Sequence, residues 1–216
     1  MEIFKVENDN NFILRSNCYV IISKNNFLVV DPSMPLEFVT EKIAESLTAK
    51  SGDLLKRFKN FGVIITHCHA DHIAHINDYV KANFKIFLTE KTLNFLNDSN
   101  VNLSKMILFK ELKVNLSKLN YQILVEGKNL IFNEEVFVKF CKGHTEDGQM
   151  FVMENYLFSG DLIFESGSVG RTDFPTGNEQ QLLESLSYLE NLDQNLIVCP
   201  GHGNNFKLFE FNVKHQ

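Results

Sequence analysis

Three histidines and an aspartate lie within six residues of the sequence, in the segment Thr66-His67-Cys68-His69-Ala70-Asp71-His72. The apolar run at 62–65 precedes this segment and is typical of a buried strand. In extended backbone, alternate side chains point to the same side, so His67 and His69 can bind one metal ion while Cys68 points away. Such a density of imidazole and carboxylate groups is typical of a metal site, and the alternative is a chance run of polar residues.

Asp71 and His72 complete this segment. If a helix begins just after His69, both lie on its first turn, where they can bind a second ion beside the first. Further candidate ligands recur downstream, each next to glycine and just past a strand-like run: His144, Asp161 and His202. Glycine allows the tight turns by which distant loops aim single side chains into one site. One such motif alone is more often an ordinary turn, but the whole set indicates a metal site.

The elements that must position these residues follow from the hydrophobic periodicity. Strands are predicted at 2–6, 11–23, 27–30, 62–66, 85–88, 121–125, 129–131, 136–140, 150–153, 156–158 and 196–199. Helices are predicted at 35–52, from the histidine cluster to about 82, at 90–96, and from 182 to near 191. Residues 98–120 are rich in Asn, Ser and Lys and have no clear assignment. The strands from 121 onward imply a second sheet, so we expect two sheets face to face with helices outside.

The composition is that of a globular protein. The chain of 216 residues is 44% hydrophobic with a net charge of -6, which predicts a single domain over 1–216. The absence of a Lys/Arg cluster argues against nucleic-acid and anionic-membrane partners and favours a small-molecule substrate. Four cysteines without a Cys-x-x-Cys pair, and an N-terminus unlike a signal peptide, predict a cytoplasmic protein. No apolar stretch approaches the roughly 20 residues that span a bilayer, so a soluble protein is expected.

The motifs together resemble the metallo-β-lactamase superfamily over nearly the whole chain. They are Asp31-Pro32, the segment 66–72, Gly143-His144-Thr145, Ser159-Gly160-Asp161 and Pro200-Gly201-His202-Gly203. The resemblance implies an α/β fold, a four-layer αββα sandwich of two mixed β-sheets flanked by helices. It further implies that one metal is held by His67, His69 and His144, that a second is held by Asp71, His72 and His202, and that Asp161 bridges the two.

The chemistry of this ligand set is that of a binuclear metallohydrolase. Neutral imidazoles leave an ion electrophilic, carboxylates balance its charge, and a bridging water becomes hydroxide near neutral pH. Such a hydroxide attacks a carbonyl carbon, with Asp161 and Asp71 as the catalytic carboxylates and Asp71 orienting the nucleophile. Zinc is the expected metal, with iron or manganese as alternatives. Asp31 is expected to be a partner of a ligand and not a ligand itself.

A second motif, Gly170-Arg171-Thr172-Asp173-Phe174-Pro175, resembles the glyoxalase II-like hydrolases. It implies hydrolysis of a thioester of a small thiol, as in a hydroxyacylglutathione hydrolase. Arg171 either pairs with a substrate carboxylate or has a structural role. The chain has Ala74-His75 where the family usually has Gly-Gly, and His75 is predicted to be a helix residue and not a ligand. Few residues follow His202, whereas glyoxalase II proper has a helical domain there that contacts glutathione, so the thiol is left open.

Other functions remain as alternatives. Persulfide dioxygenases of the same superfamily share the His-Cys-His-Ala-Asp-His and Gly-Arg-Thr-Asp-Phe stretches, and their single iron is held by the counterparts of His67, His144 and Asp161. Against this reading, that family tends to have Ala at the position of Gly201. A non-enzymatic metal-binding module and a β-lactamase are further alternatives, and we favour the hydrolase over all three.

Overall fold

The computed structural model describes residues 1–7 and 16–211, which form two compact units. Unit 1 consists of Met1–Ile65, His69–Leu88 and Leu96–Ile123, and unit 2 of Thr66–Cys68, Thr89–Phe95 and Leu124–Gln216. Part of the predicted strand at 11–23 lies outside the described residues, and within the rest the strand begins only at Cys18. The expectation of one domain over 1–216 stays a prediction.

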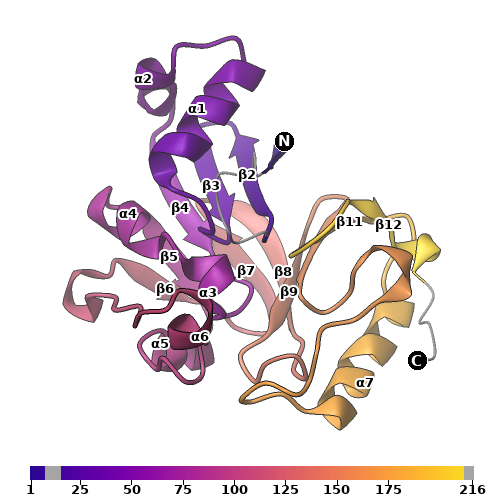
Figure 1. The fold of residues 1–216 in the computed structure, drawn as a ribbon. Coiled ribbons are helices and arrows are strands. Elements are labelled where there is room, and N and C mark those ends of the chain that lie inside the picture. Colours follow the sequence, from indigo (N-terminus) through magenta and orange to yellow (C-terminus); the bar gives the residue numbers. More distant parts are fainter. Residues whose placement is uncertain (8–15, 212–216) are drawn as a thin grey trace. The chain divides into compact units, whose positions relative to one another are not determined.

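Unit 1 is built on a six-stranded mixed sheet in the order β1-β2-β3-β4-β5-β6 (Figure 1). The strands are β1 (Glu2–Val6), β2 (Cys18–Ser23), β3 (Asn26–Val30), β4 (Asn60–Ile64), β5 (Lys85–Leu88) and β6 (Tyr121–Ile123). β1, β2 and β3 pair antiparallel, whereas β3 to β6 pair parallel. All five residues of β3 are buried, which explains its nearly unbroken apolar sequence.

The membership of β6 differs from the prediction, which placed residues 121–125 in the second sheet. β6 instead pairs parallel with β5, with Ile86 opposite Tyr121 and Leu88 opposite Ile123. A parallel neighbour requires a crossover of a dozen or more residues, and the segment between the two strands provides it. Periodicity identifies a strand and its buried face but not the strand with which it pairs.

The helices of unit 1 are short. They are α1 (Leu36–Ser46), α2 (Ser51–Leu54), η1 (Leu55–Arg57), α3 (Ala70–Ile73), α4 (Ile76–Lys81), α6 (Ser104–Ile107) and η2 (Leu116–Lys118). The predicted helix at 35–52 is therefore broken, because the chain leaves the helical conformation after Ser46 and Thr48 has φ 51°. The predicted helix after the histidine cluster is also divided, because His75 has φ -111° and ψ 14° between α3 and α4.

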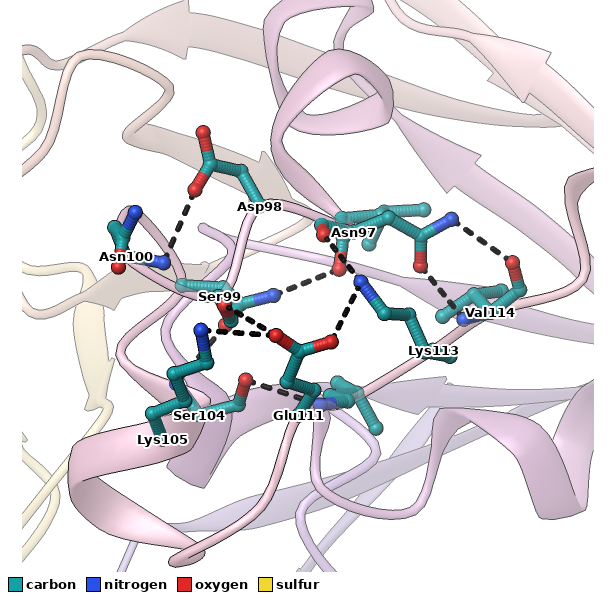
Figure 2. A network of polar contacts seen from close by, with 12 residues as sticks. Asn97, Asp98, Ser99, Asn100, Ser104, Lys105, Glu111, Lys113 and Val114 are labelled. Carbon is teal, nitrogen blue, oxygen red and sulfur yellow. Dashed lines mark hydrogen bonds and ion pairs between the residues drawn. The ribbon is translucent and has the colours of Figure 1, made fainter.

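Residues 97–114, which overlap the segment 98–120 left unassigned from sequence, are held by side-chain hydrogen bonds (Figure 2). The side-chain Nδ2 of Asn97 donates to the Val114 backbone carbonyl at 3.0 Å, and its Oδ1 accepts from the Val114 backbone N–H at 2.7 Å. Glu111 pairs with Lys105 at 2.9 Å and with Lys113 at 3.0 Å. Hydrogen bonds from these two lysines, above all Lys105, lower the pKa of Glu111 to about 2. Asn-rich composition here reflects side chains that bond the backbone.

Unit 2 contains the second six-stranded sheet, in the order β12-β11-β10-β9-β8-β7. The strands are β7 (Gly127–Ile131), β8 (Glu134–Phe140), β9 (Gln149–Met153), β10 (Tyr156–Gly160), β11 (Ile197–Pro200) and β12 (Phe206–Lys207), of which β12 was not predicted. β10 and β11 pair parallel and the other neighbours antiparallel. The helices are α5 (Glu90–Phe95), η3 (Glu165–Gly167), α7 (Glu179–Ser187), η4 (Tyr188–Asn191) and η5 (Leu208–Glu210).

Helix α7 packs on this second sheet through its apolar face. Leu182 and Leu186 of the helix belong to one buried cluster with Met150, Leu157 and Val198 of the strands. Each unit thus combines a mixed sheet with flanking helices, which confirms the predicted α/β class with two mixed sheets. Among the residues that the structure describes, no helix is long and apolar enough to cross a membrane.

Candidate metal centre

Strand direction explains why three candidate ligands of unit 2 meet. β8 and β10 both run antiparallel to β9, and β11 runs parallel to β10, so the carboxyl ends of β8, β10 and β11 lie at one edge of the sheet. His144, Asp161 and His202 lie in the loops that follow these three strands. The prediction that each lies just past a strand end is confirmed.

The separations around Asp161 are those of ligands that share a metal ion. Its Oδ2 lies 3.6 Å from His144 Nε2 and 3.5 Å from His202 Nε2. Hydrogen bonds between such groups are about 2.7–3.2 Å long. By contrast, two atoms bound tetrahedrally to one zinc ion at 2.0–2.2 Å are about 3.3–3.6 Å apart. The donor set therefore fits a divalent metal, and the same carboxylate oxygen faces both imidazoles, as a bridging ligand would.

His67 is the fourth candidate ligand in unit 2. A ligand atom of His67 lies within 4.8 Å of one on His144 and of one on Asp161. The His67 and His144 rings meet edge to face, with centroids 5.1 Å apart. The Gln149 amide donates to the Thr66 carbonyl at 3.0 Å, which anchors the segment that carries His67.

The ring of His144 is oriented by a backbone group. Its Nδ1 lies 2.7 Å from the backbone carbonyl oxygen of Arg171. A carbonyl can only accept, so Nδ1 donates to it, which leaves Nε2 as the ring nitrogen that faces Asp161 and could bind a metal. This role of Arg171 was not predicted, because the carbonyl of any residue can perform it and the sequence therefore carries no signal of it.

A glycine in the same loop allows this close approach. A Cβ at Gly170 would lie 2.1 Å from the Asp161 carbonyl oxygen and 2.9 Å from His144 Cβ. Any larger residue would displace one of these candidate ligands. The Gly-Arg pair thus serves the metal centre through backbone geometry.

The side chain of Arg171 is engaged with its own loop. Its guanidinium donates to both carboxylate oxygens of Asp173, at 2.9 and 2.6 Å, and lies 4.4 Å from the centroid of the Phe174 ring. A substrate carboxylate would have to compete with Asp173 for this group. The substrate role of Arg171 stays a prediction.

Unit 1 carries His69, Asp71 and His72. Helix α3 begins at Ala70 with His69 as its N-cap, so Asp71 and His72 lie on the first turn as predicted. His72 Nε2 lies 3.7 Å from Asp71 Oδ2, which is too long for a hydrogen bond and slightly longer than the separation of two ligands on one zinc ion. Within unit 1, the structure thus brings Asp71 and His72 together as a metal site would require.

Asp31 acts on His72 from the other side of its ring. Asp31 Oδ2 lies 2.8 Å from His72 Nδ1, and both side chains are buried. Asp31 follows β3 and has φ 54°. Its backbone N–H donates to the carbonyl of Ile64 at 2.9 Å, which holds Asp31 beside the last residue of β4. A carboxylate that accepts from Nδ1 leaves Nε2 to face a metal, in agreement with the predicted role.

His75 and Cys68 lie near the candidate ligands in sequence, but each contacts a different aspartate. His75 Nδ1 lies 3.3 Å from Asp78 Oδ2, beside its position at the start of α4. The buried Cys68 thiol donates to Asp147 Oδ1 at 3.6 Å, which agrees with the prediction that it points away from the histidines.

The sequence matches the metallo-beta-lactamase superfamily over residues 12–202. This chain belongs to the metallo-β-lactamase superfamily. It is 32% identical over 210 residues to the probable metallo-hydrolase MJ0888 of Methanocaldococcus jannaschii, with 90% of each chain covered.

Two solved structures have the same fold. The BLEG-1 B3 metallo-beta-lactamase superposes with a TM-score of 0.79 at 22% identity, covering 97% of this chain and 95% of that one. TTHA1623 in a di-iron-bound form superposes with a TM-score of 0.75 at 24% identity, covering 96% of each chain. At these identities the likeness establishes the fold.

Proposed function

We propose that this metallo-β-lactamase superfamily member is a binuclear metallohydrolase that cleaves a thioester of a small thiol. The observation that carries the hydrolase assignment is the position of Asp161 Oδ2, 3.6 Å from His144 Nε2 and 3.5 Å from His202 Nε2. A carboxylate oxygen shared by two imidazoles suits a bridge between two ions, and a bridge offsets the repulsion between two cations.

The proposed ligands come from both units. We assign one ion to His67, His69 and His144, the other to Asp71, His72 and His202, and the bridge to Asp161. Of the three residues assigned to the first ion, His67 and His144 belong to unit 2 and His69 to unit 1. Zinc is the proposed metal, with iron or manganese as alternatives, and TTHA1623 is a relative of this fold that holds two irons.

The protein groups have separate tasks in this proposal. Bound divalent ions would supply an activated water and polarise the thioester carbonyl. The Arg171 carbonyl and Asp31 hold His144 and His72 with Nε2 free of a proton. Asp71, on the first turn of α3, orients the attacking water and takes up its proton.

The thioester assignment is supported by the loop at 170–175. This loop resembles that of the glyoxalase II-like hydrolases. Within unit 2 it contacts the candidate centre directly, through the hydrogen bond between His144 Nδ1 and the Arg171 backbone carbonyl. Phe174 and the ion pair of Arg171 with Asp173 give it one apolar and one polar surface. An acylated small thiol offers both kinds of surface.

A mononuclear iron persulfide dioxygenase is the second candidate, and a specific observation favours it. Within unit 2, ligand atoms of His67 lie within 4.8 Å of ligand atoms of His144 and of Asp161, and His144 and Asp161 are 3.6 Å apart, which supplies two histidines and one carboxylate. Such a set binds non-haem iron with open positions for oxygen and a thiol. The proximity of His202 to Asp161 supports the hydrolase instead.

The two reactions differ in their need for oxygen, which provides the test. The protein, loaded separately with zinc and with iron, is assayed without oxygen on S-lactoylglutathione and on thioesters of other small thiols. Oxygen uptake with glutathione persulfide is followed in parallel. We expect anaerobic thioester cleavage. Iron-dependent oxygen consumption without cleavage of any thioester would replace the hydrolase by the dioxygenase.

A further inference from the structure

Asp147 is a buried carboxylate to which the proposed reaction gives no role. It is 2% exposed and lies three residues after His144, in the loop between β8 and β9. Its Oδ1 accepts a hydrogen bond from the Cys68 thiol at 3.6 Å. Cys68 is the residue between His67 and His69, so Asp147 reaches the first ligand motif from the side opposite its histidines.

The backbone of this loop is fixed at several points. The Cys141 amide donates to the Gly148 carbonyl at 2.8 Å, and the Gln149 amide donates to the Thr66 carbonyl at 3.0 Å. A Cβ at Gly148 would lie 2.4 Å from the Cys141 carbonyl oxygen, so the two ends of the loop approach too closely for a side chain at this position. Contacts to Thr66 and to Cys68 thus hold the chain on both sides of His67.

Helix α5 completes the surroundings of Asp147. Burial raises the pKa of Asp147, although its polar contacts with Thr145, Thr92 and Cys68 act to lower it. Thr92 lies on α5 and is buried, and the Thr89 and Thr92 hydroxyl oxygens are 2.8 Å apart. Removing a carboxyl group from water is costly, and an apolar residue of similar size is often neutral or better in such a place. Stability alone therefore does not account for a carboxyl group here.

We propose that Asp147 is a positioning residue that ties the loop carrying His144 to the segment carrying His67. Through Cys68 it sets the separation of these two imidazoles, whose ring centroids are 5.1 Å apart. The inference rests on the proposed metal centre and adds to it a residue that contacts neither metal nor substrate. Ligands held at the right separation before binding raise metal affinity, because less conformational freedom is lost when the ion binds.

The test measures metal binding by the full-length protein. Asp147→Ala and Asp147→Ser remove the acceptor, and Asp147→Asn retains an oxygen that accepts from Cys68. Glu146→Gln is the matched control, because Glu146 is adjacent in the loop and pairs with Lys91 at 2.7 Å. For each variant, the Zn²⁺ and Co²⁺ dissociation constants, the visible absorption spectrum of the Co²⁺ form and the urea unfolding of the apo protein are recorded.

We expect Asp147→Ala and Asp147→Ser to weaken metal binding about tenfold and to shift the Co²⁺ spectrum, because the ligand geometry changes. Asp147→Asn should have a metal affinity and a Co²⁺ spectrum close to those of wild type. Glu146→Gln should match wild type in both. A merely structural role would lower the stability of the apo protein but leave the dissociation constant and spectrum of the folded protein unchanged. If Asp147→Ala does not fold, Asp147→Ser decides by the same measurements.

Two failures are distinguishable. If wild-type protein binds two metal ions and the folded Asp147 variants bind them with unchanged affinity and spectrum, the positioning role is wrong and the proposed function stands. If wild-type protein binds no metal, the proposed function is wrong, and the positioning role that rests on it is wrong as well.

Discussion

His144 Nδ1 donates a hydrogen bond of 2.7 Å to the backbone carbonyl oxygen of Arg171. This single contact fixes the tautomer of a candidate metal ligand without any contribution from the arginine side chain, which pairs with Asp173. It follows that the backbone of the loop, and the glycine that precedes Arg171, matter to the metal centre. The guanidinium matters at most to the substrate.

Gly170→Ala should impair the metal centre. The new Cβ would lie 2.1 Å from the Asp161 carbonyl oxygen and 2.9 Å from His144 Cβ. Either the backbone at Asp161, just after β10, or His144 must therefore shift. We expect metal affinity to fall about 10–100-fold and the free energy of unfolding to fall by about 1–3 kcal/mol. Arg171→Ala is the control, with metal affinity unchanged and, if the side chain binds substrate, a raised KM. Equal metal affinity in both variants would contradict this assignment.

Asp161 should be the least replaceable residue of the centre, because it faces both His144 and His202. Elemental analysis of wild-type protein should find two divalent ions per chain. Asp161→Ala should lose activity and metal, and His202→Ala should retain one ion. The exposed Asp193 provides the control, since Asp193→Ala should keep full loading. One ion per chain in metal-replete wild type, unchanged by His202→Ala, would refute the binuclear site.

Asp31 should support His72 through their hydrogen bond of 2.8 Å. Asp31→Ala removes the acceptor and places alanine at φ 54°, so we expect a loss of about 1–3 kcal/mol in the free energy of unfolding and a 10–100-fold weaker metal affinity. Asp31→Asn should recover most of both, because asparagine tolerates a positive φ and retains an accepting oxygen. Urea unfolding and metal titration of the two variants measure this difference.

Glu111 should titrate with a pKa of about 2, because Lys105 and Lys113 donate to its carboxylate. Its folded pKa lies below the ordinary 4.5, so its contribution to stability is present above pH 4.5 and is lost as pH falls toward 2. Carbon-detected NMR of the carboxyl group should show this midpoint, and Lys113→Gln should raise it. Salt should also raise it, because the carboxylate is exposed and its charge is screened. A midpoint near 4.5 in low salt would disprove the network's effect.

Much of the candidate centre could be predicted because it is local. The spacing of His67, His69, Asp71 and His72 is interpretable once the chain runs from a strand into a helix, and α3 begins at Ala70 as expected. His144, Asp161 and His202 were identifiable because each follows a strand and adjoins glycine. Periodicity of two or of 3.6 residues depends only on neighbours in the chain, so most strands and α7 were also predicted correctly.

The tertiary structure decided what depends on partners far apart in sequence. In the structure, β6 pairs with β5 and does not belong to the second sheet. The backbone carbonyl of Arg171 accepts a hydrogen bond from His144. Asp147 is buried against Cys68, a contact between residues 79 positions apart. Side-chain type and spacing determine which groups can perform chemistry. Which backbone carbonyl, carboxylate or strand lies next to them depends on long-range packing, and local sequence does not encode that choice.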